Sequence, residues 1–189
     1  NMPDEALMEL GQIIKVSIAQ VAPPATTLVN LMTLLGKNAG GTRTIALASS
    51  FYRLVMKLAA DDIVDWDATN AGPWDSAVKH NSCVRAHVLR ALDVELAVQK
   101  GESQVHILWD LRKFFDSVRL AILRGRLHKL GYPKVLLAYG AVVHRAPRLL
   151  IAGDCASQVI SRTGGSILAG CPQSMSWIRG LLHQLLTKL

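Results

Sequence analysis

The sequence contains little cysteine and no apolar run long enough to cross a membrane. Its three cysteines, Cys83, Cys155 and Cys171, lie far apart, without a CxxC pair or a histidine at ligand spacing. This spacing argues against a zinc site and a disulfide framework, and it favours a reducing, intracellular compartment, either nucleus or cytoplasm. Because no run of about 18 apolar residues occurs, we expect no transmembrane helix and no membrane partner.

Acidic residues are also scarce relative to basic ones. The 189-residue chain carries 21 Lys and Arg against 14 Asp and Glu, a net charge of +7, and 50% of its residues are hydrophobic. The hydrophobic share excludes disorder as the main state, and the positive charge favours a polyanionic partner, because neutralised phosphates release counterions. The chain begins with Asn1 and stops inside an apolar-periodic segment, so we expect a fragment of a longer protein.

Apolar spacing and capping residues predict a mixed order of helices and strands. Helices are predicted for residues 3–20, 49–66, 76–101, 117–131, 133–146 and from 172 onward. Strands are predicted twice within residues 28–49, around a Gly-rich turn, then at 103–111 and as a hairpin at 148–161. The order lacks regular βαβ alternation, so the expected fold class is α+β in one partial domain, residues 1–189.

The stretch HILWDLRKFFDSV, residues 106–118, places Asp110 at the end of an apolar strand. A carboxylate at that position, followed by a tight turn, can bind Mg²⁺, which prefers one or two carboxylates together with substrate phosphates and water. Asp110 can equally cap the next helix. From these residues alone both interpretations remain open.

Two glycine-containing segments also carry candidate binding residues. In GKNAGGTRTIAL, Gly40 and Gly41 permit a tight turn, and Lys37 and Arg43 flank it. This pattern suits a hairpin that closes over a triphosphate, since arginine grips phosphate oxygens in a bidentate way, but it also suits a solvated surface hairpin. In GGSILAGCPQSMSW, a loop enters a helix with Gln173 in its first turn. Such a loop can approach a base pair from the minor-groove side, or simply cap the helix.

Two charged groups elsewhere have surface interpretations. The segment RLAILRGRLHK could follow a nucleic-acid backbone or form a solvated helix face through its basic residues, Arg119, Arg124, Arg126 and Lys129. The acidic group Asp61, Asp62, Asp65 and Asp67 is predicted to be a solvated face.

Taken in order, these segments resemble the motifs of reverse transcriptases, particularly those of non-LTR retroelements and group II introns. The basic hairpin resembles GGxRPI, SSFYRLVMK is similar to SxxYRLxxK, and HILWDLRKFFDSV is similar to hhxDhxxxFDxh, where h is hydrophobic. The later stretch RLLIAGDCASQVISRTGGSILAGCPQSMS resembles RxhxhxGxxSxxhxxxxGhxQGxxxS. The likeness extends from about residue 30 to residue 185.

The resemblance implies an RNA-directed DNA polymerase, a nucleotidyltransferase of a retrotransposon or similar mobile element. It implies polymerase fingers at about residues 1–100 and an incomplete palm at residues 101–189, with an antiparallel sheet packed against helices. The implied partners are an RNA template, a DNA primer and a dNTP, and the implied cofactor is a pair of Mg²⁺ ions. The resemblance says nothing about oligomeric state.

Within the strand motif, the resemblance assigns Asp110 as the catalytic residue and a ligand of both metals. The backbone from Leu111 to Phe115 would line the nucleotide pocket. Phe115 falls at the aromatic position that blocks the sugar 2′-OH, which favours deoxynucleotides. Asp116 would then support the turn.

The other motifs imply substrate contacts, with departures from the family pattern. Arg43, assisted by Lys37, would hold the incoming triphosphate, and Gln173 would lie against the nascent base pair. RPI is RTI here, and PQG is PQS, so Ser174 lets the backbone approach a substrate less closely. The family's two-aspartate motif does not occur before Leu189.

In the intact domain, the primer 3′-hydroxyl would attack the α-phosphate of a dNTP, assisted by the two ions. Since further carboxylates are missing, we expect residues 1–189 alone to bind template or nucleotide weakly and not to polymerise. Three alternatives stay open: the palm of an RNA-dependent RNA polymerase, an inactive retroelement relic that acts as a basic nucleic-acid-binding module, and a structural α+β protein.

Overall fold

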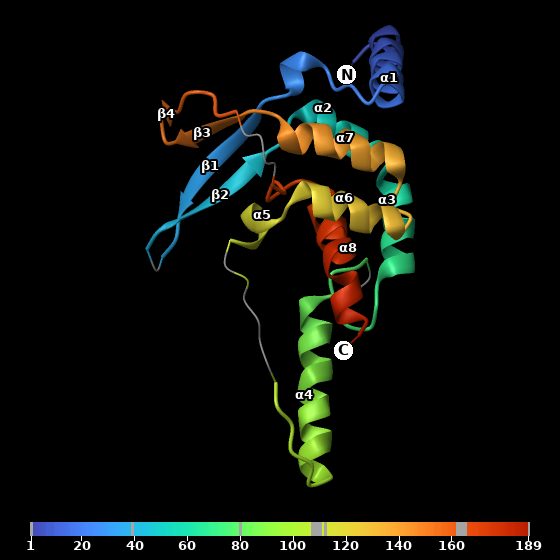
Figure 1. Ribbon diagram of the computed structural model, residues 1–189, viewed down its shortest axis with the longest axis vertical. Coiled ribbons are helices and arrows are strands. Elements are labelled where there is room, and N and C mark those ends of the chain that lie inside the picture. Colours follow the sequence, from blue (N-terminus) through green and yellow to red (C-terminus); the bar gives the residue numbers. More distant parts are fainter. Residues whose placement is uncertain are drawn as a thin grey trace.

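The structure is a computed structural model that describes residues 2–38, 40–79, 81–106, 111, 113–161 and 166–188 (Figure 1). Its helices and strands are α1 (Asp4–Ala19), the short 3₁₀ helix η1 (Ala25–Thr27), β1 (Asn30–Gly36), β2 (Thr42–Leu47), α2 (Ser50–Leu58), α3 (Ala60–Asn70), α4 (Cys83–Gln99), α5 (Phe114–Ser117), α6 (Leu120–Lys129), α7 (Lys134–Arg145), β3 (Arg148–Ala152), β4 (Cys155–Ala156) and α8 (Ser174–Leu186). This combination of helices with a small sheet is consistent with the predicted α+β class. None of the described helices is long and apolar enough to span a bilayer.

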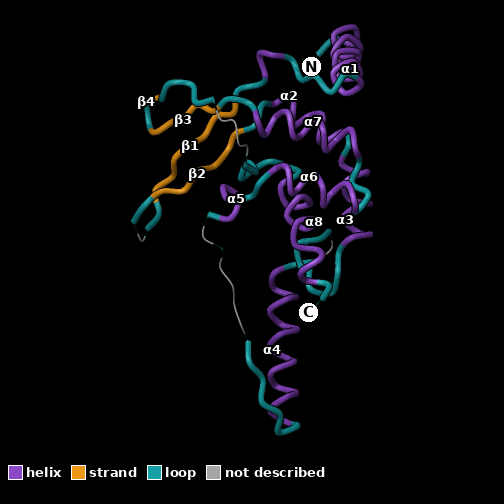
Figure 2. Tube along the Cα trace, viewed as in Figure 1, coloured by secondary structure: helices purple, strands orange, loops and turns teal. Residues whose placement is uncertain are grey.

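The sheet has the strand order β2-β1-β3-β4 and lies at one side of the helices (Figure 2). β1 and β2 form the predicted antiparallel hairpin, and Gly40 and Gly41 take positive φ angles of 84° and 83° in its turn. The predicted hairpin of β3 and β4 is also antiparallel. The expectation of an antiparallel sheet is wrong in one place, because β1 pairs with β3 in parallel. The long helical connection between them returns the chain in the same direction, as a parallel pair requires.

The core lies between the helices and the inner face of the sheet. Its fully buried large side chains include Tyr52 of α2, Leu123 of α6 and Trp177 of α8.

Local signals explain where several helices begin and end. The Oγ of Ser49 accepts a hydrogen bond from the Tyr52 amide at 3.2 Å and caps α2. Gly131, with a φ of 71°, ends the α6 segment before α7 begins.

Three predicted elements differ from the structure. The helix expected at 49–66 is divided into α2 and α3 at Ala59, and the helix expected from residue 76 begins at Cys83, where Ser82 caps it. The strand expected at 103–111 is wrong for residues 103–106, which are exposed and belong to no strand. An apolar run becomes a strand only where a neighbour satisfies its backbone groups, and these residues have no such neighbour in the described sheet. Residues 107–110 lie outside the described part of the chain.

Helix α4 projects from the rest of the molecule (Figure 1). Of the residues described in it, only Ala97 is buried, and apolar residues such as Leu89, Leu92 and Leu96 are about half exposed.

Candidate functional site

The basic hairpin presents its cations on the outer face of the sheet. Arg43 lies opposite Leu35 in the register of β1 and β2, and both side chains are exposed. Lys37 follows β1 directly, and its backbone closes the turn through hydrogen bonds with Gly40 and Gly41, each of 3.0 Å. Neither Lys37 nor Arg43 forms an ion pair with any residue that the structure describes. Both charges are therefore available to an anion.

Asp110, the predicted metal ligand, lies outside the described residues. The segment that follows it turns sharply, because Lys113 takes a left-handed φ of 50°, and α5 comes next. Phe115 is half-buried, whereas Leu111 is exposed. The carbonyl of Phe115 accepts a hydrogen bond from the Ile167 amide at 3.2 Å, so α5 lies against the loop that leads to Gln173.

Gln173 lies in the core. It is fully buried, its Nε2 donates to the Leu136 carbonyl at 3.3 Å, and its Oε1 accepts from the Tyr52 hydroxyl at 3.3 Å. Gly140 of α7 provides the space for this side chain, because a Cβ at that position would overlap Oε1. In this arrangement the amide of Gln173 faces α2 and α7 and not the surface.

A chain of buried hydrogen bonds continues from Gln173 to α7. The hydroxyl of Tyr52 lies 3.1 Å from the Sγ of Cys171, and Nε2 of His144 lies 3.1 Å from the same sulfur. The amide of Leu168 donates to Nδ1 of His144 at 3.2 Å, so the proton of the neutral ring is on Nε2 and points at the sulfur. The donors then follow one direction, from His144 through Cys171 and Tyr52 to Gln173.

Burial keeps the members of this chain neutral. It lowers the pKa of His144 to about 3, and it raises the pKa of the Cys171 thiol and of the Tyr52 hydroxyl. A cysteine beside a histidine can form a nucleophile and base, but that chemistry needs a thiolate that a substrate can reach. Here both groups are buried and uncharged, so their contact holds the loop in place.

The same loop binds the edge of the sheet. The Ala46 amide of β2 donates to the Ala169 carbonyl at 2.8 Å. Gly170, with a φ of 98°, lies so close to β2 that a Cβ at this position would be 3.0 Å from the Ala46 carbonyl oxygen. The hairpin, α2 and the loop at 166–173 therefore contact one another, although they are far apart in the sequence.

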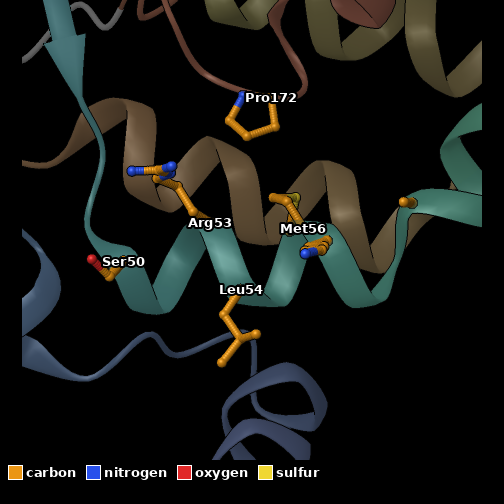
Figure 3. Close-up of a pocket in the computed structure, with 7 residues that line it drawn as sticks. Ser50, Arg53, Leu54, Met56 and Pro172 are labelled. Atoms are coloured by element: carbon orange, nitrogen blue, oxygen red, sulfur yellow. The ribbon is translucent and has the colours of Figure 1, made fainter.

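A surface pocket of about 450 Å³ lies on the outer side of α2, next to this loop (Figure 3). Arg53 projects from the side of α2 that faces Pro172, which forms the opposite wall, and Lys57 lies one turn further along the helix. Both cations are exposed. Sequence reasoning missed this pocket, although the spacing of Arg53 and Lys57 by four residues places them on one helix face.

One buried ion-pair network supports α8 from the side of α3. The guanidinium of Arg179 contacts the carboxylates of Asp67 and Asp75, and its Nη2 donates to the Ala77 carbonyl at 2.9 Å. Ser176 donates to Asp67 at 2.9 Å. The prediction that Asp67 belongs to a solvated face is therefore wrong, since this carboxylate joins α3 to α8.

No group of three or more His, Cys, Asp or Glu side chains in the described part of the chain is arranged to hold a metal ion. Comparison with protein-family models and with curated proteins gives no match for this chain.

Proposed function

We propose that the chain is part of an RNA-directed DNA polymerase domain of a retroelement, which in the intact protein transfers a dNTP to a primer 3′-hydroxyl. The observation that carries the proposal is the convergence of β2, α2 and the loop at 166–173. Each of these segments carries one of the motifs that resemble those of reverse transcriptases. The loop is joined to β2 by the hydrogen bond from Ala46 to Ala169 and to α2 by the hydrogen bond from Tyr52 to Gln173.

In this proposal the exposed cations of the hairpin bind the triphosphate. Arg43 supplies a planar, permanently charged group that can contact two phosphate oxygens, and Lys37 adds a second charge at the turn. Phe115 would face the sugar, and Leu111 would lie beside it. The role of Gln173 against a base pair stays a prediction, and it would require the side chain to leave its buried hydrogen bonds.

The described residues do not supply a carboxylate cluster that fits a pair of Mg²⁺ ions. Asp110 remains the proposed ligand, on the strength of its motif alone. The proposal therefore rests on the binding of nucleotide and template, and its test should measure binding directly.

The test is the affinity of the chain for a fluorescent dNTP in the presence of Mg²⁺. Arg43→Ala should weaken binding about tenfold, because it removes a charge-assisted bidentate contact. Arg90→Ala, which removes an exposed arginine from α4, is the matched control and should leave binding unchanged. Asp110→Ala should abolish the dependence on Mg²⁺. Binding that neither variant alters would contradict the proposal.

A second assay separates the polymerase classes. If Phe115 faces the sugar, the chain should prefer a dNTP to the corresponding ribonucleotide, and Phe115→Ala should remove that preference. An RNA-dependent RNA polymerase would show no such preference in either form. Primer extension on an RNA template by residues 1–189 alone would contradict the expectation that these residues do not polymerise.

One observation favours the alternative of a basic nucleic-acid-binding module. Exposed cations without ion pairs occur on several described elements, while the same elements show no metal-binding cluster. RNA binding that depends on salt, survives Asp110→Ala and is accompanied by no Mg²⁺-dependent nucleotide binding would support this alternative over the polymerase.

A further inference from the structure

A groove of about 470 Å³ lies between α6 and α7, away from the hairpin and from the loop at 166–173. Arg124 and His128 line it from α6, and Lys134 and Arg145 line it from α7. We propose that this basic groove is a second nucleic-acid site that binds the phosphodiester backbone of a strand. The proposal deepens the proposed function, and it rests on that function for the identity of the ligand as nucleic acid.

Small residues create the depression between the two helices. The turn through Gly131 returns the chain, so that α7 runs back alongside α6 (Figure 1). Gly125 and Ala138 then face the groove, and a Cβ added to Gly125 would meet no heavy atom within 4 Å. The floor is therefore open, and the long basic side chains stand along its edges.

The charges of the groove are available for binding. All four basic side chains are exposed, and none of Arg124, Lys134 and Arg145 forms an ion pair with a described residue. No acidic residue among those described lines the groove. Uncompensated positive charge in a depression attracts polyanions more strongly than the same charges spread over a convex surface.

The basic residues of α6 divide between two faces. Arg126 donates to the Leu181 carbonyl of α8, so this side chain has a structural contact. Arg124 forms no ion pair with a described residue, and it lines the groove. Of the three Lys and Arg side chains that line the groove, α6 therefore supplies Arg124, and α7 supplies Lys134 and Arg145.

The length of the groove suits several consecutive phosphates. Lys134 and Arg145 begin and end α7, and a rise of about 1.5 Å per residue separates their Cα atoms by about 16 Å. A stacked strand carries one phosphate about every 3.4 Å of its axis. A single phosphate or pyrophosphate would use only one end of such a site.

The test compares two triple variants in fluorescence anisotropy with an unstructured, labelled RNA over a salt series. The groove variant carries Arg124→Ala, Lys134→Ala and Arg145→Ala. The control variant carries Arg85→Ala, Arg90→Ala and Lys100→Ala, which remove the same charge from exposed positions on or next to α4. The groove variant should bind about tenfold or more weakly, and the slope of log K against log salt should fall by about 2, because each single-strand contact contributes about 0.7.

A further variant, Gly125→Glu, places a negative charge on the open floor of the groove. It should weaken RNA binding without a loss of thermal stability, since position 125 is exposed and a Cβ there meets no described heavy atom within 4 Å. Equal effects of the groove and control variants would overturn the proposal, because the total charge alone would then explain binding. Competition by inorganic pyrophosphate as strong as that by RNA would also overturn it and indicate a small-anion pocket.

The experiments can refute the groove proposal and the polymerase proposal independently of one another. If the groove variant loses RNA affinity while no form of the chain binds a dNTP with Mg²⁺, the groove proposal is supported and the polymerase proposal is refuted. If the groove variant keeps full RNA affinity while Arg43→Ala impairs dNTP binding, the groove proposal falls and the polymerase proposal stands.

Discussion

The position of Gln173 can be tested by adding a single methyl group to α7. Gly140→Ala would place a Cβ in overlap with Gln173 Oε1 and 2.8 Å from Cζ2 of Trp177. Both neighbours are fully buried, so neither can move aside freely. The overlap should cost about 1–3 kcal/mol, and displacement of Oε1 from the Tyr52 hydroxyl should cost about 1 kcal/mol more.

The higher helix propensity of alanine opposes this steric cost, so the sign of the change in unfolding free energy shows which of the two effects is larger. Alanine is favoured over glycine in a helix interior by about 1 kcal/mol. The net destabilisation by Gly140→Ala should therefore be about 2 kcal/mol, which lowers the Tm of a chain of this size by about 4–8 °C. Gly125→Ala is the matched control, because the same substitution in α6 meets no atom and should stabilise the fold by about 1 kcal/mol.

Urea denaturation monitored by tryptophan fluorescence measures both changes. In a Gln173→Ala background, the penalty for Gly140→Ala should shrink by about 1 kcal/mol, because one of the two overlaps is gone. If Gly140→Ala is as stabilising as Gly125→Ala, the side chain of Gln173 does not occupy the core. Its amide would then be free to contact a substrate, as the resemblance implies.

Three further predictions concern the buried polar groups. Arg179→Ala should destabilise the fold by about 3–5 kcal/mol, because Asp67 and Asp75 lose the cation that compensates their charges. Urea denaturation measures this change, and an unchanged midpoint would show that the ion-pair network is not formed. Cys171 should react with a thiol reagent only as fast as the protein unfolds, whereas the two exposed cysteines should react at once; a third fast thiol would contradict its burial. Burial, with a smaller contribution from a nearby arginine, holds the pKa of His144 at about 3, against 6.5 in the unfolded chain. Between these two pH values the unfolded state binds a proton that the folded state does not bind, so protonation favours unfolding. Stability should fall as pH drops through 6.5 toward 3, by about 2 kcal/mol at pH 5, and His144→Gln should remove this part of the slope.

Elements with local causes could be predicted from the sequence. The hairpin of β1 and β2 follows from two glycines between apolar runs, and the start of α2 follows from the hydroxyl of Ser49. The parallel pairing of β1 with β3 depends on residues more than a hundred positions apart, and no local pattern specifies it. The strand prediction was wrong at residues 103–106 for the same reason, since the apolar composition of one segment says nothing about a neighbouring strand.

The candidate site was predictable only in its exposed part. Charge and turn chemistry correctly indicated a solvent-facing hairpin with Lys37 and Arg43. The burial of Gln173 had no local signal, because its partners Tyr52 and Leu136 come from two other helices. The α6–α7 groove likewise required the structure, since Arg124 and Arg145 approach one another only when the two helices pack.

The difference between exposed and buried motif residues decides which of them can test the proposed function. Tyr52, Cys171 and Gln173 belong to motifs that resemble those of reverse transcriptases, yet their hydrogen bonds to one another are sufficient to explain why a folded chain would use them. Substitution at any of the three would disturb the core, and a loss of activity would say little about substrate. Arg43 is different, because it is exposed and has no ion-pair partner among the described residues. A loss of nucleotide binding in Arg43→Ala at unchanged stability can therefore be attributed to the ligand, and Lys37→Ala provides an independent repeat of the same measurement.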